Sequence, residues 1–375
     1  MQNTFIYPGS SVELRVILKN LNRVRLFLVT GKRSYIQSGA EAIFENYNND
    51  YELYIFSDFQ TNPNYEDVKR GTELFVQFKA EVIIAIGGGS TLDMGKLINY
   101  YHNCNTDNIP KSNFINERFD PVPIICIPTT AGSGSESTNF AVMYVNGIKY
   151  SIQHKNLLPH FVFIDPELHF SQTSYQKAVS GIDAFSQAVE SLWSIKSTDE
   201  SRTYAERSLK LIWENYYKVV HSHDNLAHLN MAVGANLAGK AINISNTTAP
   251  HALSYKITSL YGVPHGHAVA LTLPLFFDYN FSCIPKICDL NLKKTLIEAK
   301  DTIFRILKCK SINEGKSKIE RLILDAGLEM KLSKLGSRDK KDIKKIVEDV
   351  NQQRLSNNPY PVSGNSLINM LENIW

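Results

Sequence analysis

The sequence predicts an α/β domain followed by an all-α domain, and two features of its pattern carry that prediction. Up to about residue 171, short β-branched and apolar runs alternate with segments of helical length, which indicates a parallel sheet covered by helices. From residue 172 onwards, apolar residues recur at three- and four-residue spacing, which is typical of helices. Since 375 residues are enough for two hydrophobic cores, we expect domains at 1–171 and 172–375.

Five runs are expected to form the strands of the sheet. Each is short and apolar, and each stops at glycine, proline or a polar residue. In chain order they are VRLFLVTG from Val24, YELYIFSDF from Tyr51, AEVIIAIGGGS from Ala80, PVPIICIPTT from Pro121 and FVFIDPEL from Phe161. Strands that alternate with helices in this way build Rossmann-like sheets, so the first domain is of a nucleotide-binding type.

Composition excludes several classes of function. A net charge of +3 is spread along the chain and is locally dense only at 331–345, so no nucleic-acid-binding surface is indicated. The five cysteines include no CxxC pair, which favours reduced thiols over disulfides. The N-terminus has no signal-peptide pattern and no apolar run approaches roughly 18 residues, so we expect a cytoplasmic protein without a membrane partner.

Two loops have the composition of anion-binding sites. The segment IAIGGGSTLDMGK at 84–96 runs from a strand through three glycines into a helix that we expect to open at Ser90 and Thr91. The segment PTTAGSGSE at 128–136 follows another strand. Residues without a Cβ let the backbone approach a pyrophosphate, and a helix N-terminus offers it N–H groups. The first loop does not match GxGxxG, and a tight turn is its alternative interpretation.

Two such loops at the carboxyl ends of strands predict a bound dinucleotide. The residues that we expect to contact it from these loops are Gly87, Gly88, Gly89, Ser90, Thr91, Asp93, Thr129, Thr130 and Ser133.

Two histidines occupy matched positions in the second domain. Pro250 and Pro264 each suit the first turn of a helix, and each is followed at once by a histidine, His251 and His265. Two imidazoles that converge from neighbouring helix starts indicate a divalent metal. The alternative is that each histidine only satisfies a buried polar contact.

A carboxylate strengthens the metal interpretation. Asp183 and Gln187 are four residues apart in GIDAFSQAVESLW, so they share one face of a predicted helix. One carboxylate and two imidazoles suit Zn²⁺ or Fe²⁺ with a coordination position left open for substrate. Gln187 is then either a weak further ligand or a group that orders a water molecule.

In combination these motifs resemble those of the iron-containing (group III metal-dependent) alcohol dehydrogenases, which are related to dehydroquinate synthase and glycerol dehydrogenase. The motifs occur in the family's order: GGGSTLDMGK at 87–96, PTTAGSGSE at 128–136, DPEL at 165–168, GIDAFSQAVE at 181–190, AGKAIN at 238–243, GVPHG at 262–266 and NNP at 357–359. The resemblance implies a dinucleotide domain, a helical domain, a metal in the cleft between them, and NAD(P)-dependent alcohol dehydrogenase activity. The oligomeric state stays open, a homodimer included.

By position, the resemblance implies that Asp183, His251 and His265 bind the metal, Fe²⁺ or Zn²⁺. Gln187 falls where the family usually has a fourth ligand, a histidine. Tyr255 falls where many members have a histidine close to the nicotinamide, which changes the expected proton path.

The resemblance also bears on the choice of dinucleotide. Members that prefer NAD tend to have an aspartate just after the strand that VRLFLVTG resembles, where this chain has Gly31, Lys32, Arg33 and Ser34. No carboxylate in this segment repels a 2′-phosphate, and two cations and a hydroxyl are present to bind it. We therefore expect NADP(H) in preference to NAD(H), with a solvated turn as the alternative. Lys149 is expected to contact the cofactor or the substrate.

Within the family, DAFSQAVESLWS, KYS at 149–151, TTAPHALSY and PHGHAVAL most resemble the branch of phosphonoacetaldehyde reductases, also called hydroxyethylphosphonate dehydrogenases. A phosphonate dianion needs cations, and we expect Lys240 to supply one, with Lys149, Arg354 and His267 as additions. The alternatives are that Lys240 only extends its ammonium into water and that His267 has a structural role at a helix start. The implied mechanism has a metal that polarises the carbonyl and a nicotinamide that delivers hydride. A proton arrives through water, the ribose hydroxyls, Tyr255 or His267.

Three alternatives stay open. The first is a family member that acts on another small aldehyde, alcohol or polyol. The second is a lyase resembling dehydroquinate synthase, which returns its NAD unchanged. The third is a nonenzymatic dinucleotide-binding protein in which Gln187 marks a decayed site.

Overall fold

The computed structural model describes residues 2–45, 47, 50–102, 120–146, 148–348 and 350–375. The chain forms two compact units, Met1–Gln172 and Thr173–Trp375. Among the described cysteines, Cys126, Cys283, Cys288 and Cys309 are free thiols, and Cys104 lies outside the described residues. None of the described helices combines the length and the apolar composition needed to cross a lipid bilayer.

The first unit is built on a six-stranded parallel sheet with the strand order β1-β8-β5-β4-β2-β3. Its strands are β1 (Asn3–Ile6), β2 (Arg25–Thr30), β3 (Glu52–Phe56), β4 (Val82–Gly87), β5 (Ile124–Pro128) and β8 (Phe161–Ile164). All five predicted runs lie in this sheet, and the predicted α/β class is confirmed. The edge strand β1 was not predicted, because four residues carry too little pattern to separate a strand from a loop.

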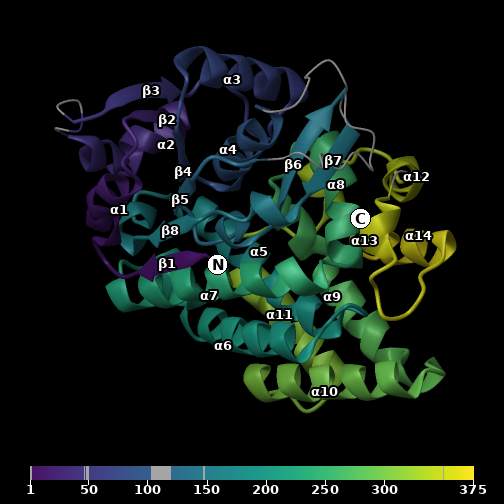
Figure 1. Ribbon diagram of the computed structural model, residues 1–375. Helices are drawn as coiled ribbons and strands as arrows, with labels where there is room; N and C mark the ends of the chain where they lie inside the picture. Colours follow the sequence, from purple (N-terminus) through teal and green to yellow (C-terminus); the bar gives the residue numbers. More distant parts are fainter. Residues whose placement is uncertain (1, 46, 48–49, 103–119, 147, 349) are drawn as a thin grey trace. The chain divides into compact units, whose positions relative to one another are not determined.

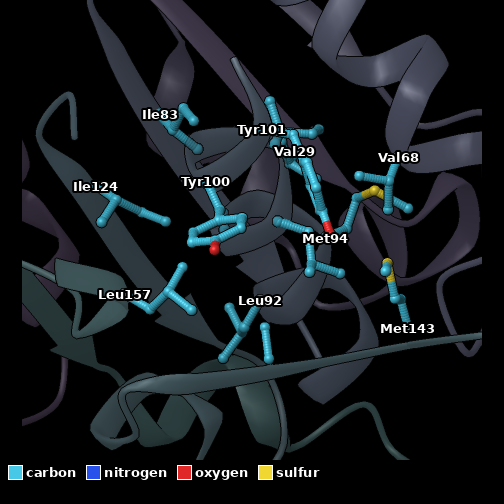
Figure 2. Packing of buried hydrophobic residues seen from close by; sticks show 14 of the residues in the cluster. Val29, Val68, Ile83, Leu92, Met94, Tyr100, Tyr101, Ile124, Met143 and Leu157 are labelled. Atoms are coloured by element: carbon cyan, nitrogen blue, oxygen red, sulfur yellow. The ribbon is translucent and has the colours of Figure 1, made fainter. Parts of the chain in front are cut away.

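Two hydrophobic clusters cover the two faces of this sheet. Because successive strand residues point to opposite faces, Phe27 and Val29 of β2 belong to one cluster, and Leu26 and Leu28 belong to the other. The first cluster also contains residues of α3 (Tyr65–Phe78) and α4 (Gly89–Tyr101), and the second contains residues of α1 (Leu14–Leu21). Figure 2 shows part of the first cluster, which includes Val29 of β2 and Met94 and Tyr101 of α4.

The connection between β5 and β8 contains a hairpin that was not predicted. A short 3-10 helix, Ser135–Ser137, leads into β6 (Phe140–Val145), which pairs antiparallel with β7 (Ile148–Gln153). The helix α4 begins at Gly89, one residue earlier than expected. A further short helix, α2 (Lys32–Gln37), follows β2.

The regular elements among the described residues of the second unit are all helices, as predicted. Its helices are α5 (Ser174–Trp193), α6 (Asp199–His221), α7 (Asn225–Ser245), α8 (Ala249–Tyr261), α9 (His265–Ser282), α10 (Leu290–Leu307), α11 (Ile312–Asp325), α12 (Lys341–Glu348), α13 (Gln352–Leu355) and α14 (Gly364–Glu372). Helix α5 packs against α6, α7 and α9, and it is buried along most of its length (Figure 1). It starts at a capping box in which Thr173 and Gln176 satisfy each other's backbone N–H groups.

Candidate metal centre

Three helices of the second unit bring Asp183, His251 and His265 together. Asp183 lies in the middle of α5, and the two histidines lie in the first turns of α8 and α9. One ligand atom from each of the three residues lies within 4.8 Å of the other two. Asp183 Oδ1 is 3.4 Å from His251 Nε2, and the two imidazole rings are 5.3 Å apart between centroids.

The two prolines act as the sequence predicts, with one difference. Pro250 lies in the first turn of α8, whereas Pro264 is the N-cap residue of α9, one position outside the helix. Neither site requires the N–H that proline lacks, since the first N–H groups of a helix have no partner within it. Both histidines therefore still lie in a first helical turn.

Gly266 allows α9 to approach α5 closely. A Cβ on Gly266 would clash with the carbonyl oxygen of Val179 and would lie 2.8 Å from Asp183 Cβ. Real Cβ atoms do not come this close to a backbone oxygen, so only glycine fits here. The missing side chain places His265, the preceding residue, beside the carboxylate of Asp183.

Gln187 lies next to the carboxylate, on the predicted face of α5. Its amide Nε2 donates a hydrogen bond to Asp183 Oδ2 at 3.2 Å, and only 3% of Gln187 is exposed. This bond leaves Asp183 Oδ1 as the oxygen that faces His251. Gln187 therefore orients Asp183, whatever further contact it makes.

Glu190 belongs to the same site and was not predicted. It is fully buried on α5, its Oε1 accepts a hydrogen bond from His251 Nδ1, and its Oε2 accepts bonds from Thr248 N at 2.6 Å and Thr248 Oγ1 at 2.8 Å. The spacing of Asp183, Gln187 and Glu190 along one helix face was the signal that could have revealed it. Because its Nδ1 donates to Glu190, His251 presents Nε2 to the centre.

The electrostatics of the site favour a cation. Burial lowers the pKa of His251, but Glu190 and Asp183 outweigh that effect and raise it to about 9. One carboxylate oxygen and two imidazole nitrogens form a donor set that Fe²⁺ and Zn²⁺ both accept. Ligands about 2.1 Å from one ion lie at most about 4.2 Å apart, so small side-chain shifts bring the three donors to bonding distance. The residues present therefore fit a divalent metal.

Tyr255 and Arg354 lie beside the centre. The Tyr255 ring stacks on the His265 ring with centroids 5.7 Å apart and planes at 24°. Burial raises the pKa of Tyr255, and the neighbouring Arg354 opposes that rise. Arg354 is itself 7% exposed and donates from Nη1 to Asn246 Oδ1 at 2.7 Å.

His267 and Lys240, which were predicted to serve the proton path and the substrate, occupy different surroundings. His267 is buried on α9, where Nε2 pairs with Glu329 O at 2.7 Å and Nδ1 pairs with Tyr175 Oη at 3.0 Å. A carbonyl only accepts, so Nε2 carries the proton and Nδ1 accepts from the phenol. Lys240 is half-buried near the end of α7, six residues before Asn246.

In the first unit, the two predicted phosphate loops touch each other. They follow β4 and β5, which are neighbours in the sheet and pair Gly87 with Pro128. A Cβ on Gly88 would lie 3.4 Å from Thr130 Cγ2, and one on Gly89 would lie 2.6 Å from Ser133 Oγ. The glycines thus make room for the second loop.

The remaining loop residues have protein partners of their own. Ser90 Oγ accepts from Asn62 N at 3.1 Å, and the Thr91 side chain packs against Gly87. Thr129 N donates to Gly87 O at 3.0 Å. Both carboxylate oxygens of Asp93 accept hydrogen bonds from protein groups, and Lys149 lies on β7, where its charge lowers the pKa of the Asp93 carboxyl against the larger effect of burial.

The segment after β2 is paired with a carboxylate that was not predicted. Asp58, just beyond β3, lies 2.7 Å from Lys32 Nζ in an exposed ion pair. Gly31 is the N-cap residue of α2, and a Cβ on Gly31 would lie 2.5 Å from the Ser34 hydroxyl. Asp58 was missed because it is 26 residues from Lys32 and only the parallel pairing of β2 with β3 brings them together.

Comparison with known proteins places the chain in one family. Residues 2–166 match the model of the iron-containing alcohol dehydrogenases, and residues 177–375 match that of the C-terminal domain of the same family. Long-chain-alcohol dehydrogenase 1 of Geobacillus thermodenitrificans is 27% identical over 83% of this chain and 79% of its own length. The 1,3-propanediol dehydrogenase of Klebsiella pneumoniae is 30% identical over 77% of this chain and 74% of its own length.

The fold has close counterparts among solved structures. Sulfoacetaldehyde reductase from Bifidobacterium kashiwanohense, in complex with NAD⁺, superposes with a TM-score of 0.86 at 24% identity, covering 100% of this chain and 96% of that one. The chain spans 33% of a longer relative, aldehyde-alcohol dehydrogenase 2 of Entamoeba histolytica. With its parallel α/β unit, its helical unit and the Asp183, His251 and His265 cluster, this chain belongs to the iron-containing alcohol dehydrogenase family and is an NAD(P)-dependent oxidoreductase of that family.

Proposed function

We propose that this enzyme reduces a small aldehyde that carries an anionic group, with phosphonoacetaldehyde as substrate and 2-hydroxyethylphosphonate as product. The observation that carries the proposal is the position of Arg354. Its guanidinium is buried beside Tyr255, which stacks on the ligand His265. A guanidinium forms paired hydrogen bonds with phosphonate oxygens, and burial strengthens such bonds because little water competes for them.

The residues of the site have distinct parts in this reaction. Asp183, His251 and His265 hold the metal, while Gln187 and Glu190 orient two of these ligands. When bound, the metal supplies a Lewis acid for the carbonyl oxygen and the dinucleotide supplies the hydride.

The product oxygen needs a proton after hydride transfer. The Tyr255 ring stacks on the His265 ring, so we assign its O–H group to the start of the proton path. His267 remains the alternative donor, although its proton is engaged by Glu329 O and its other nitrogen by Tyr175.

The preferred cofactor in this proposal is NADPH. The first turn of α2 carries Lys32 and Arg33, both exposed, and Gly31 stands where an aspartate would repel a 2′-phosphate. Asp58 neutralises part of the charge of Lys32, which leaves Arg33 and Ser34 as the principal groups for the phosphate.

A second candidate function is dehydrogenation of a neutral alcohol or diol. It is favoured by the relatives named for long-chain alcohols and for 1,3-propanediol, which share 27% and 30% identity with this chain. In that function Arg354 has only a structural part, since it also ties α13 to the end of α7 through Asn246.

The two functions are separated by steady-state kinetics of protein stripped with a chelator and reloaded with Fe²⁺ or Zn²⁺. NADPH oxidation is followed with phosphonoacetaldehyde and with propanal, an uncharged aldehyde of similar size. We expect kcat/KM to be at least about a hundredfold higher for the anionic aldehyde, because the hydrogen bonds between a guanidinium and a charged group contribute up to about 3 kcal/mol and propanal cannot form them.

A matched pair of variants tests whether Arg354 causes the preference for the anionic aldehyde. Arg354→Met should raise KM for phosphonoacetaldehyde and leave the rate with propanal nearly unchanged, whereas Arg338→Met changes an exposed arginine elsewhere in the same unit. Equal kcat/KM for the two aldehydes in the wild type would contradict the proposal that the substrate is anionic. Turnover by the chelator-stripped protein without added metal would contradict the proposed role of the metal.

A further inference from the structure

Lys96 is a fully buried lysine in the middle of α4, the helix that begins at the glycine loop. Its Nζ donates hydrogen bonds to Thr138 O at 2.9 Å, Thr138 Oγ1 at 3.0 Å and Phe140 O at 2.9 Å. An ammonium has three N–H donors, so these three bonds use its full capacity. Lys96 is therefore committed to the segment that it holds and has no donor left for a ligand.

Asp93 holds the same segment from one helical turn earlier. Its Oδ1 accepts a hydrogen bond from the Ser135 hydroxyl, and its Oδ2 accepts one from Val142 N at 3.0 Å. Lys96 Nζ is 3.9 Å from Asp93 Oδ1, so the two side chains also form an ion pair. Together they fasten residues 135–142 to α4 at both ends and in the middle.

This segment continues directly from the second phosphate loop. That loop, Thr129–Ser133, lies against the glycine loop, where a Cβ on Gly89 would come 2.6 Å from Ser133 Oγ. The N-terminus of α4 thus carries one loop, and its Asp93 and Lys96 side chains hold the chain that follows the other. A single rigid helix sets the spacing between the two loops.

We propose that Lys96 and Asp93 are positioning residues for the dinucleotide: by fixing residues 135–142 on α4, they set the Thr129–Ser133 loop against Gly87–Gly89 before the pyrophosphate binds. The inference rests on the proposed assignment of these two loops to the cofactor. Two loops that are already in place pay no ordering cost on binding, and this raises affinity without any direct contact between the ligand and the residues that hold them.

A role in packing alone explains the charge of these two residues less well than the positioning role does. Burying an ammonium and a carboxylate costs free energy that an apolar pair of similar volume would not. The charged pair makes five directional hydrogen bonds to residues 135–142, whereas apolar side chains would make none. All five bonds form together only when this segment has one particular backbone conformation. A fixed conformation of this segment is important because the ligand must contact both phosphate loops at the same time.

The test combines cofactor binding with hydrogen exchange of the full-length protein. Lys96→Met keeps most of the length of the side chain and removes its three hydrogen bonds. Thr138→Val removes only the hydroxyl, which accepts from Lys96 Nζ at 3.0 Å and donates to Ser135 O at 3.2 Å, and leaves the backbone acceptors of Lys96 in place. The equilibrium Kd values for NADPH and NADH are measured by calorimetry, without substrate, and amide hydrogen exchange is measured on the cofactor-free protein. Lys19→Met, which changes an exposed lysine of α1, is the matched control.

For Lys96→Met we expect the Kd of the dinucleotide to rise by about tenfold to a hundredfold, with kcat at saturating cofactor changed by less than about threefold. Amides of 129–142 should exchange faster, while those of the central strands keep their protection. Thr138→Val should move both quantities in the same direction by a smaller amount, and it carries the test if Lys96→Met does not fold.

Three outcomes overturn the inference. The first is a folded Lys96→Met or Thr138→Val variant with unchanged Kd. The second is a raised Kd without faster exchange at 129–142, since that would indicate direct contact with the ligand. The third is faster exchange spread evenly over the first unit, which would indicate a structural role only. A wild-type protein that binds neither dinucleotide would overturn the cofactor assignment itself, and the inference with it.

Discussion

Glu190 and His251 share a fully buried hydrogen bond in which Glu190 Oε1 accepts from the Nδ1–H group of the imidazole. The other carboxylate oxygen accepts two bonds from Thr248, the N-cap residue of α8, and the Thr248 hydroxyl also accepts a bond from Trp193 Nε1 at 2.9 Å. Glu190 thereby fixes both the start of α8 and the tautomer of the first histidine on it. Carboxylates that hold a ligating histidine in this way tune metal affinity as well as ring orientation.

Replacing Glu190 should weaken metal binding without unfolding the protein. Glu190→Gln retains an acceptor for Thr248 but removes the charge that holds His251, and we expect metal affinity to fall by about tenfold to a hundredfold. The measurement is competition with a chromophoric chelator for Fe²⁺ or Zn²⁺. Glu298→Gln, on an exposed face of α10, is the control. Metal affinity equal to that of the wild type would show that Glu190 does not position the ligand.

Filling the space at Gly266 should separate α9 from α5. Gly266→Ala forces Cβ against Val179 O and Asp183 Cβ, and we expect it to lower the free energy of unfolding by about 3 kcal/mol and to reduce metal occupancy. Gly364→Ala is the matched control, because its Cβ would meet only Val347 Cγ1 at 3.7 Å. Thermal unfolding and metal analysis are the measurements, and a variant of normal stability and full occupancy contradicts the prediction.

An aspartate at position 31 should change the choice of dinucleotide. Gly31→Asp places a carboxylate where it repels a 2′-phosphate and accepts from ribose hydroxyls, so we expect the ratio of kcat/KM for NADPH to that for NADH to fall by at least about tenfold. The backbone at Gly31 is extended, and only the movable Ser34 hydroxyl stands in the way. Gln37→Asp adds the same charge at the far end of α2, and the ratio should stay unchanged there.

Removing the phenol of Tyr255 should affect turnover more than substrate binding. Tyr255→Phe keeps the stack on His265 and removes the O–H group, and we expect kcat for reduction to fall by about a hundredfold with little change in KM. His267→Gln is the comparison, because its bonds to Tyr175 and Glu329 predict a loss of stability with kcat largely kept. The reverse pattern would move the proton path from Tyr255 to His267.

His169 should make the first unit less stable in mild acid. Its Nε2 bonds to Pro128 O at 3.1 Å, its Nδ1 meets no hydrogen-bond partner among the described residues, and burial lowers the pKa of the ring to about 4. The unfolded chain takes up a proton near pH 6.5 and the folded chain does not. The contribution of the neutral His169 ring to the free energy of unfolding is therefore fully present above pH 6.5, and it is lost as the pH falls towards 4.

The size of that effect follows from the difference in pKa. Between pH 7 and pH 5 the wild type should lose about 2 kcal/mol more of its free energy of unfolding than His169→Gln, which keeps a donor for Pro128 O and cannot titrate. Urea denaturation at the two pH values measures this difference. Parallel losses in the two proteins would show that His169 is protonated in the folded state.

The metal-site residues were accessible from sequence to different degrees. Asp183, His251 and His265 stood out because a helix start after proline and a helix face with four-residue spacing are local patterns. Glu190 carries the same spacing, but nothing in the sequence distinguishes a buried glutamate from an exposed one. Gly266 was visible as part of a motif, yet its reason, the approach of α9 to Val179 and Asp183, is a property of packing.

The sequence by itself determined the order of an α/β unit and a helical unit, the five central strands and the three residues that converge in the second unit, because two- and 3.6-residue periodicity and helix-start chemistry act between near neighbours. Only the tertiary structure decided that Lys32 pairs with Asp58, that Lys96 binds Thr138 and that Glu190 binds His251. These partners are 26, 42 and 61 residues apart, and such contacts arise when strand pairing and helix packing bring distant segments together.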